Sequence, residues 1–269
     1  MAAIKTPLVP ALDRGLTVLE MVAKSRSGLT FSQLARSLDF PKSSIHSMLV
    51  TFERLGYLHR SETTGRYACG IKLAEIANMA LDGTGMREKA SPLLRSLSER
   101  TGLTVHLAIL EGQEATLIAK ATTAGGQHIA TWTGKRLDLH CTSLGKCLLA
   151  YLDETQVGEI IRKRGLLRHN ENTIRSFRKL KEDLEITRAR GFALDDQEEE
   201  IGVRCVGAPI FNADGRVTAA VSLSATIEQI GPENQKELIS ALQHTAVAIS
   251  DRLGWTGQPR VPVLSEIRV

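Results

Sequence analysis

Closely spaced breaks between residues 30 and 69 constrain the fold of this chain more than any other feature of its sequence. Thr30 and Gln33 have the spacing of a capping box, in which each side chain bonds a free backbone N–H at a helix start. A short helix therefore begins there. Pro41 ends it and suits the first turn of a following helix, at about 41–54, because its missing N–H is not needed in that position.

A β-hairpin is predicted after these helices. Two short extended runs, 57–60 and 66–69, flank a polar loop that ends in Gly65. A further amphipathic helix precedes them at about 11–24, with spacings of three and four between its apolar residues. We expect its buried face to be Leu12, Leu16, Leu19 and Ala23, and that of the 41–54 helix to be Ile45, Met48, Leu49 and Phe52. Three helices and a hairpin make a winged helix-turn-helix.

In this fold the second helix of the helix-turn-helix lies in the major groove of DNA. Short polar side chains on the first turns of that helix let its backbone approach the base edges closely. The candidate DNA-contacting residues are Ser32 and Arg36 before the turn, Lys42, Ser43, Ser44, His46 and Ser47 after it, and Arg60, Thr63, Thr64 and Arg66 in the wing. Residues 1–82 hold 10 Lys and Arg against 7 Asp and Glu, whereas the remaining 187 residues hold 24 against 23. A solvated helix face would explain any one of these features, but their coincidence favours DNA binding.

The second part of the chain mixes helices and strands. We expect helices at 86–100, 142–152, 153–163, 173–190 and 233–253, and strands at 104–110, 115–121, 201–211 and 216–225. Gly215 ends a hairpin turn between the last two strands, which makes them antiparallel. The predicted organisation is a DNA-binding domain at 1–69, a linker helix at 70–85, an α+β domain at 86–255 and a loosely ordered tail at 256–269.

Polar positions in this second part indicate a small-molecule pocket. Along the strand 217–225, Ser222 and Ser224 project from the face opposite the apolar one. The helix at 142–150 starts with Ser143, Leu144 and Gly145, whose free N–H groups could bind an anion, and we expect the glycine to let a ligand come close. The alternative for the strand face is contact with water.

The alternative to a small-molecule pocket in this part of the chain is an enzyme that uses cysteine, histidine and carboxylate. Its candidates would be Cys141, Cys147, Cys205, His106, His140, Asp195 and Asp196, but no nucleophile–base signature surrounds any of them. His106, His128 and His140 lack metal-ligand spacing. We therefore expect no catalytic residues, no metal and no cofactor.

The cellular setting is expected to be the cytoplasm. None of the 4 cysteines forms a CxxC pair, which is consistent with free thiols in a reducing compartment. The first residues lack the apolar run of a signal peptide. No stretch approaches the 18 apolar residues of a membrane span, so a membrane is not expected as a partner.

Several long motifs resemble the IclR family of bacterial regulators, in the family's order over about residues 10–255. They are RGLTVLEMVA, LTFSQLARSLDFPKSSIHSMLVTFERLGYLHR, TTGRYACGIKLAEIA, HCTSLGKCLLAYL, GFALDDQEEEIGVRCVGAPIF and GRVTAAVSLSA. The resemblance implies a GAF-like effector-binding domain with an antiparallel sheet, a homodimer or homotetramer, and control of a metabolic operon.

The same resemblance implies particular effector contacts. Residues matching the family's pocket are Asp195, Cys205, Ser222 and Ser224, with Ser143 and Leu144 contributed by a loop. Cys147 departs from the small residue expected after the Gly-Lys pair, which leaves the pocket size open. The implied partners are an organic acid and double-stranded DNA, the latter with a pseudo-palindromic operator because a dimer has two-fold symmetry.

Overall fold

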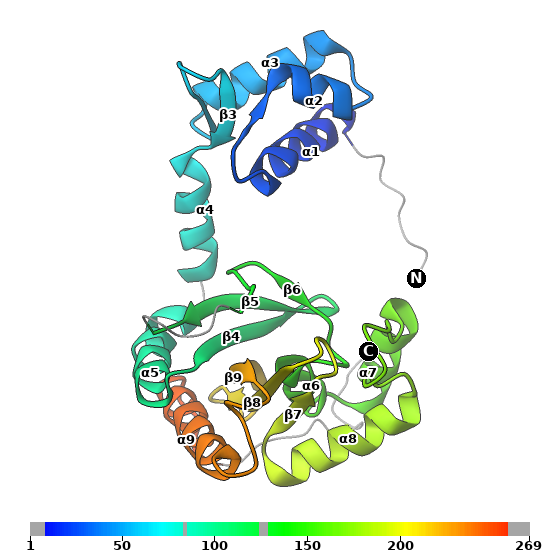
Figure 1. The fold of residues 1–269 in the computed structure, drawn as a ribbon, viewed down its shortest axis with the longest axis vertical. Helices are drawn as coiled ribbons and strands as arrows, with labels where there is room; N and C mark the ends of the chain where they lie inside the picture. Colours follow the sequence, from blue (N-terminus) through cyan, green and yellow to red (C-terminus); the bar gives the residue numbers. More distant parts are fainter. Residues whose placement is uncertain (1–8, 83–84, 124–128, 258–269) are drawn as a thin grey trace. The chain divides into compact units, whose positions relative to one another are not determined.

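The computed structural model describes residues 9–82, 85–123 and 129–257, and the chain divides into two compact units at residue 83 (Figure 1). The tail expected at 256–269 lies almost wholly outside the described residues, as does His128. Among the described residues, no helix is both long and apolar enough to cross a membrane.

The N-terminal unit is a winged helix-turn-helix. Its elements are α1 (Pro10–Lys24), β1 (Leu29–Thr30), α2 (Phe31–Ser37), α3 (Lys42–Arg54), β2 (Leu58–Arg60), β3 (Arg66–Cys69) and α4 (Ile71–Asp82). The strands form an antiparallel sheet in the order β1-β3-β2. The capping box is present: the Gln33 N–H donates to Thr30 Oγ1 at 3.3 Å, and the Thr30 N–H donates to Gln33 Oε1 at 2.9 Å.

The buried face of α1 differs from the expected one. Leu12 is 62% exposed and Leu16 is 49% exposed, whereas Gly15, Val18 and Val22 are buried. The expected set and the observed set of residues both recur every three or four positions, so periodicity alone does not tell which set is buried. Gly15 decides the outcome, because a Cβ at this position would already lie 3.4 Å from the Phe52 ring, and the bare glycine lets α1 approach α3 closely.

The core of this unit is aliphatic, with one aromatic side chain. Its buried members are Val18, Val22, Leu34, Ile45, Leu49, Leu58 and Tyr67. Ile45 and Leu49 were expected on the inner face of α3; Met48 and Phe52 pack against the same core but are only partly buried. The core fixes α2 and α3 relative to each other, and so fixes the polar face of α3.

The C-terminal unit is an antiparallel sheet with helices on both faces. Its elements are α5 (Met86–Thr101), β4 (Thr104–Glu111), β5 (Glu114–Ala121), β6 (Arg136–Leu137), α6 (Ser143–Leu149), α7 (Glu154–Arg164), α8 (Phe177–Arg190), β7 (Ala193–Asp196), β8 (Val203–Phe211), β9 (Val217–Thr226) and α9 (Gln235–Arg252). The strand order is β6-β5-β4-β9-β8-β7. Helices α5 and α9 pack together and against the sheet, while α6, α7 and α8 gather on the other side (Figure 1).

Two strands of the C-terminal unit were not expected from the sequence. The short β6 pairs with β5, and β7 pairs with β8 at the edge of the sheet, with Asp195 opposite Cys205. The run of acidic and amide residues at 195–200 is by itself typical of a solvated loop. Instead, β7 carries Asp195 into the sheet, where the residue is 2% exposed.

Candidate functional site

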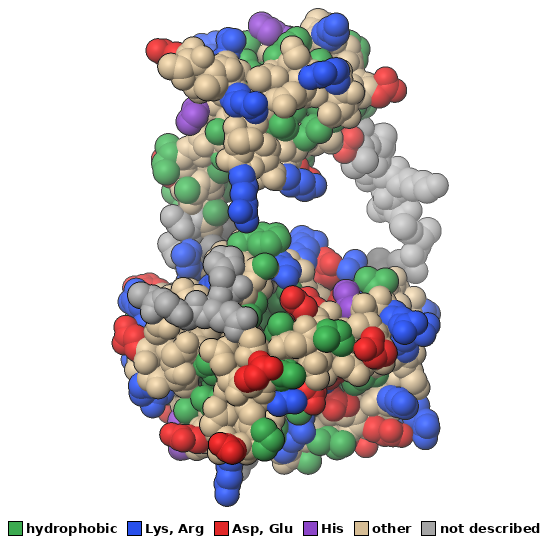
Figure 2. Space-filling view, viewed as in Figure 1, with side chains coloured by type: hydrophobic (Ala, Val, Ile, Leu, Met, Phe, Trp, Pro, Cys, Tyr) green, Lys and Arg blue, Asp and Glu red, His purple; other side chains and the backbone are tan. Residues whose placement is uncertain are grey.

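The candidate DNA-contacting residues form the outer surface of the N-terminal unit. Nine of them are exposed: Ser32, Arg36, Lys42, Ser43, His46, Ser47, Arg60, Thr63 and Thr64. Ser44 and Arg66 are partly buried. Figure 2 shows several Lys and Arg side chains, with a few Asp and Glu side chains, on the visible face of this unit.

Arg66 and Arg60 differ in how firmly the fold holds them. The Arg66 guanidinium donates to the Gly28 carbonyl at 2.9 Å and lies 3.5 Å from Gln33 Oε1, so it joins the wing to the start of α2. Arg60 is exposed and lies over the Tyr67 ring, with its Cζ atom 5.6 Å from the ring centroid. Of the two, Arg60 is therefore the freer to meet a phosphate.

A cavity of about 290 Å³ lies in the C-terminal unit between the sheet and the start of α6. The sheet contributes polar and apolar side chains to its wall, and loops complete it. Its described lining is His106, Leu117, Ile129, Ala130, Thr131, Lys135, Leu137, Thr142, Ser143, Leu144, His169, Asp195, Glu199, Glu200, Val203, Cys205 and Ser224. Five residues expected at an effector site thus meet here: Ser143, Leu144, Asp195, Cys205 and Ser224.

Asp195 is a carboxyl group held in its neutral form. Burial raises its pKa to about 8, and the charges of Glu198 and Glu199 act in the same direction. The Glu198 N–H donates to Asp195 Oδ1 at 2.8 Å, which fixes the carboxyl group. At neutral pH most Asp195 side chains carry a proton and can donate a hydrogen bond to an anion.

His106 lines the cavity, although its sequence position indicated only a candidate for catalysis or metal binding. Its Nε2 lies 2.7 Å from Thr131 Oγ1, and its Nδ1 lies 3.2 Å from Ser224 Oγ. Burial lowers its pKa to about 3, with Lys120 and Lys135 adding to the effect, so the ring is neutral. The sequence does carry a signal for this position: apolar residues alternate with others along 104–110, and His106 falls on the side opposite Val105, Leu107 and Ile109.

Two expected effector residues lie behind the cavity wall. Among the described residues, neither Gly145 nor Ser222 belongs to the lining. Ser222 is paired with His106 on one neighbouring strand and Gly207 on the other, and its buried hydroxyl has no hydrogen-bond partner among the described residues. A Cβ on Gly207 would lie 2.6 Å from the Ser143 carbonyl, so α6 lies directly over this part of the sheet.

Gly145 was expected to let a ligand come close to the helix start, and this reason for the glycine was wrong. A Cβ at Gly145 would meet the backbone of Leu139, 2.4 Å from its Cα atom, so the glycine serves helix packing and not ligand approach. Its N–H is also occupied, donating to Thr142 Oγ1 at 3.1 Å. The helix start thus offers the N–H groups of Ser143 and Leu144 only, because Thr142 caps the third.

Lys146 fixes the acidic segment that carries Asp195. This fully buried side chain places its Nζ 2.5 Å from Glu198 Oε1 and 3.0 Å from Asp183 Oδ2, and it also donates to the Leu194 carbonyl. Burial disfavours the charged amine, but the two carboxylates outweigh it and raise the pKa of Lys146. The charged lysine therefore ties α6 to α8 and to the end of β7.

The three cysteines of the C-terminal unit do not have the properties of nucleophiles. Burial raises the pKa of Cys147 to about 12, and burial likewise raises the pKa of Cys141 and of Cys205. A reactive cysteine needs the opposite shift, because the thiolate is the attacking species. The arrangement favours binding of a small molecule over covalent catalysis.

The N-terminal unit has the winged helix-turn-helix fold of DNA-binding proteins, and the C-terminal unit contains a cavity large enough for a small molecule. The family model of the IclR helix-turn-helix domain matches residues 11–62, and that of the bacterial transcriptional regulator IclR C-terminal domain matches residues 78–251. The chain belongs to the IclR family of transcriptional regulators.

Similar proteins include a repressor and two solved structures. The chain is 32% identical to the Escherichia coli transcriptional repressor IclR over 234 residues, or 86% of this chain and 85% of that protein. Thermotoga maritima IclR is 32% identical, with a TM-score of 0.82 over 91% of this chain and 99% of that one. An IclR homologue from Microbacterium hydrocarbonoxydans, solved with 4-hydroxybenzoate, is 24% identical with a TM-score of 0.80 over 90% of this chain and 98% of that one.

Proposed function

We propose that this regulator controls a metabolic operon and that a small organic acid, bound in the C-terminal cavity, sets its affinity for the operator. The observation that carries the proposal is the neutral Asp195 carboxyl group inside a cavity of about 290 Å³. A carboxylate ligand can accept the Asp195 proton in a hydrogen bond, whereas an ionised aspartate would repel it.

Basic, neutral polar and apolar residues of the lining support the same ligand class, while the Glu199 and Glu200 side chains set the acidic side of the cavity. The Lys135 ammonium contributes positive charge, and Ser224, Thr131 and neutral His106 supply hydroxyl and imidazole partners. Apolar walls are provided by Leu117, Ile129, Leu137 and Leu144. An acid with a compact apolar or aromatic body and a second polar group satisfies both parts. A ligand of this kind, 4-hydroxybenzoate, accompanies the Microbacterium homologue.

The DNA-binding half of the proposal uses the exposed polar face of α3 with α2 and the wing. Lys42, Ser43, Ser44, His46 and Ser47 would read base edges, and Ser32, Arg36, Arg60, Thr63, Thr64 and Arg66 would hold phosphates. A homodimer or homotetramer would present two such faces to a pseudo-palindromic operator.

Two measurements on the full-length protein test the proposal. A thermal-shift screen against small carboxylic acids should raise the melting temperature of the C-terminal unit, because a ligand that binds the native state stabilises it by mass action. Gel shifts with duplex DNA from the promoter region of the regulated operon should show binding of the protein. The acid that raises the melting temperature should change the affinity of that complex. The matched amide of the active acid is the control, because it lacks the charge. An acid that binds without any effect on the operator complex would contradict the proposal.

A further inference from the structure

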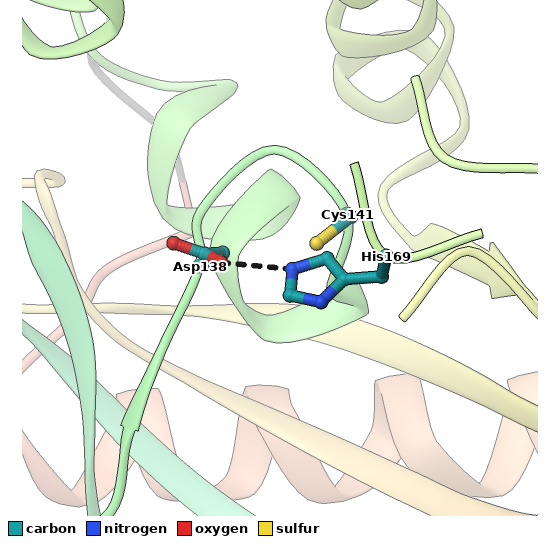
Figure 3. A group of neighbouring side chains, drawn as sticks. All are labelled: Asp138, Cys141 and His169. Atoms are coloured by element: carbon teal, nitrogen blue, oxygen red, sulfur yellow. Dashed lines mark hydrogen bonds and ion pairs between the residues drawn. The ribbon is translucent and has the colours of Figure 1, made fainter. Parts of the chain in front are cut away.

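Three side chains of different chemistry converge beside the effector cavity. Asp138 follows β6, Cys141 precedes α6, and His169 lies in the segment between α7 and α8 (Figure 3). Each offers one ligand atom, and the three atoms all lie within 4.8 Å of one another. The His169 Nε2 and Asp138 Oδ2 atoms are 2.9 Å apart, and Figure 3 shows the Cys141 sulfur directed toward the same space.

A carboxylate oxygen, a thiolate sulfur and an imidazole nitrogen are the donors that Zn²⁺ takes in proteins. Zinc–ligand bonds of about 2.0–2.3 Å put neighbouring donors of a tetrahedral site roughly 3.5 Å apart. The present separations therefore require movements on the order of 1 Å to close around an ion. Three protein ligands leave the fourth position open, as in sites where zinc also holds water or a small molecule.

The surroundings of Cys141 support the same site. The thiol is completely buried, and its sulfur lies within 4.8 Å of an Asp138 carboxylate oxygen and a His169 ring nitrogen. A divalent cation deprotonates a coordinating thiol and balances the charge of an adjacent carboxylate. The hydrogen bond between His169 and Asp138 accounts for two members of the cluster, but not for the thiol beside them.

Neighbouring basic side chains do not occupy the atoms of Asp138 and His169 that would face a metal ion. Arg164 approaches Asp138 at the other carboxylate oxygen, with its Nη2 3.8 Å from Oδ1, while Oδ2 is the atom that faces His169. His140 lies beside His169, with ring centroids 6.4 Å apart, but its Nε2 is already 3.0 Å from the Leu167 carbonyl. His169 is exposed and lines the cavity, so an ion has a path to the cluster.

We propose that Asp138, Cys141 and His169 bind one Zn²⁺ ion per chain at the edge of the effector cavity. On binding, a Zn–S bond forms and the Cys141 thiol loses its proton to water, so affinity rises with pH. Since His169 and Thr142, the neighbour of Cys141, both line the cavity, the open coordination position is available to a carboxylate ligand. The zinc site itself does not depend on any effector, and it is measured without one.

The test uses full-length protein freed of metal with a chelator. Zn²⁺ competition against a chromophoric chelator should give one site per chain, and Co²⁺ should give a near-ultraviolet thiolate-to-cobalt charge-transfer band. Cys141→Ser should abolish that band, and Cys141→Ser and His169→Gln should each weaken Zn²⁺ binding at least tenfold. The exposed Cys69 and His244 provide matched controls: Cys69→Ser and His244→Gln should change neither readout.

Folding effects are separated by a third variant. Asp138 is half-buried, so Asp138→Asn keeps the size of the side chain and removes its charge. It should weaken Zn²⁺ binding while the melting temperature without metal stays close to that of the parent protein. Absence of a stoichiometric site, a cobalt spectrum without the Cys141-dependent band, or Zn²⁺ affinity unchanged in His169→Gln and Asp138→Asn would each overturn the proposal.

Discussion

The protons held by buried residues determine what the effector cavity can bind. Asp195 and His106 both lie in its wall, and burial moves their pKa values in opposite directions, to about 8 and about 3. Both groups are therefore uncharged at neutral pH, one as a donor and one as a donor or acceptor according to its tautomer. The cavity thus offers hydrogen bonds without a fixed negative charge at Asp195.

The Asp195 shift predicts a particular pH dependence of stability. Between the unfolded pKa of about 3.9 and the folded value of about 8, the native state holds one more proton than the unfolded state. Stability from this group therefore falls as pH rises through that window, by about 1.4 kcal/mol per pH unit. Asp195→Asn should remove this part of the slope between about pH 5 and pH 7, and should be the more stable protein at pH 7.

Urea unfolding followed by tryptophan fluorescence measures this effect. Trp132 and Trp255 are the 2 tryptophans of the chain, and both belong to the C-terminal unit, so the signal reports on that unit. Asp196→Asn is the control, because Asp196 is exposed and pairs with Arg204 on the surface. An identical pH slope in Asp195→Asn and the parent protein would show that Asp195 is ionised in the fold.

The two serines of β9 should differ in their effect on the effector. Ser224 lines the cavity and its Oγ lies 3.2 Å from His106 Nδ1, whereas Ser222 lies beneath α6. A hydrogen bond to a charged ligand contributes about 1.5–3 kcal/mol. Ser224→Ala should therefore weaken binding of the active acid about ten- to a hundredfold in calorimetry. Ser222→Ala should weaken it less, and equal losses in both variants would place the ligand deeper, under α6.

At the scale of elements, residues typical of caps and turns were a better guide to the fold than the spacing of apolar residues. The capping box at Thr30 and the hairpin turn ending at Gly215 depend on neighbouring residues, and both are present. The face of α1 depends on which stripe meets Phe52, which is a tertiary contact. The short strands β6 and β7 have 2 and 4 residues, too few for a period to be detected.

Element packing also explains which site residues the sequence could indicate. Ser224 and Asp195 were identified by resemblance, and the alternation along β9 supported Ser224 independently. The cluster of Asp138, Cys141 and His169 has no sequence signature, because its members come from three separate segments of the chain. Only the meeting of those segments around α6 brings the donors together.

The approach of α6 to the 139 backbone predicts a sensitive position at Gly145. The methyl group of Gly145→Ala would lie 2.4 Å from Leu139 Cα and 2.5 Å from its carbonyl oxygen, so backbone must move. Overpacking of this kind destabilises by about 1–3 kcal/mol. Gly158→Ala in α7 is the matched control, because no atom lies within 4 Å of its added Cβ and alanine favours helix by about 1 kcal/mol. In urea unfolding, Gly145→Ala should be less stable than the parent protein, and Gly158→Ala should be at least as stable. An unchanged free energy of unfolding in Gly145→Ala would contradict the packing of α6 against Leu139.

For the whole molecule, the salt dependence of DNA binding tests the role proposed for the N-terminal unit. That unit carries the candidate DNA-contacting cations and hydroxyls, whereas the C-terminal unit carries the cavity. If a dimer binds the operator, each phosphate contact occurs twice. The salt dependence of binding then counts contacts per assembly and not per chain.

Arg60 is the residue with which to make that count. Each phosphate neutralised adds about 0.9 to the slope of log affinity against log salt, so Arg60→Ala in a dimer should lower the slope by about 1.8. The loss should be the same on operator and on unrelated duplex, because phosphate contacts carry no sequence information. Arg66→Ala provides the contrast: it also removes the hydrogen bond to the Gly28 carbonyl and should lower the melting temperature of the N-terminal unit, which Arg60→Ala should leave nearly unchanged. Fluorescence anisotropy at several salt concentrations measures the slope. A reduction near 0.9 would mean that only one Arg60 of the assembly meets DNA, and an unchanged slope would remove the wing from the interface.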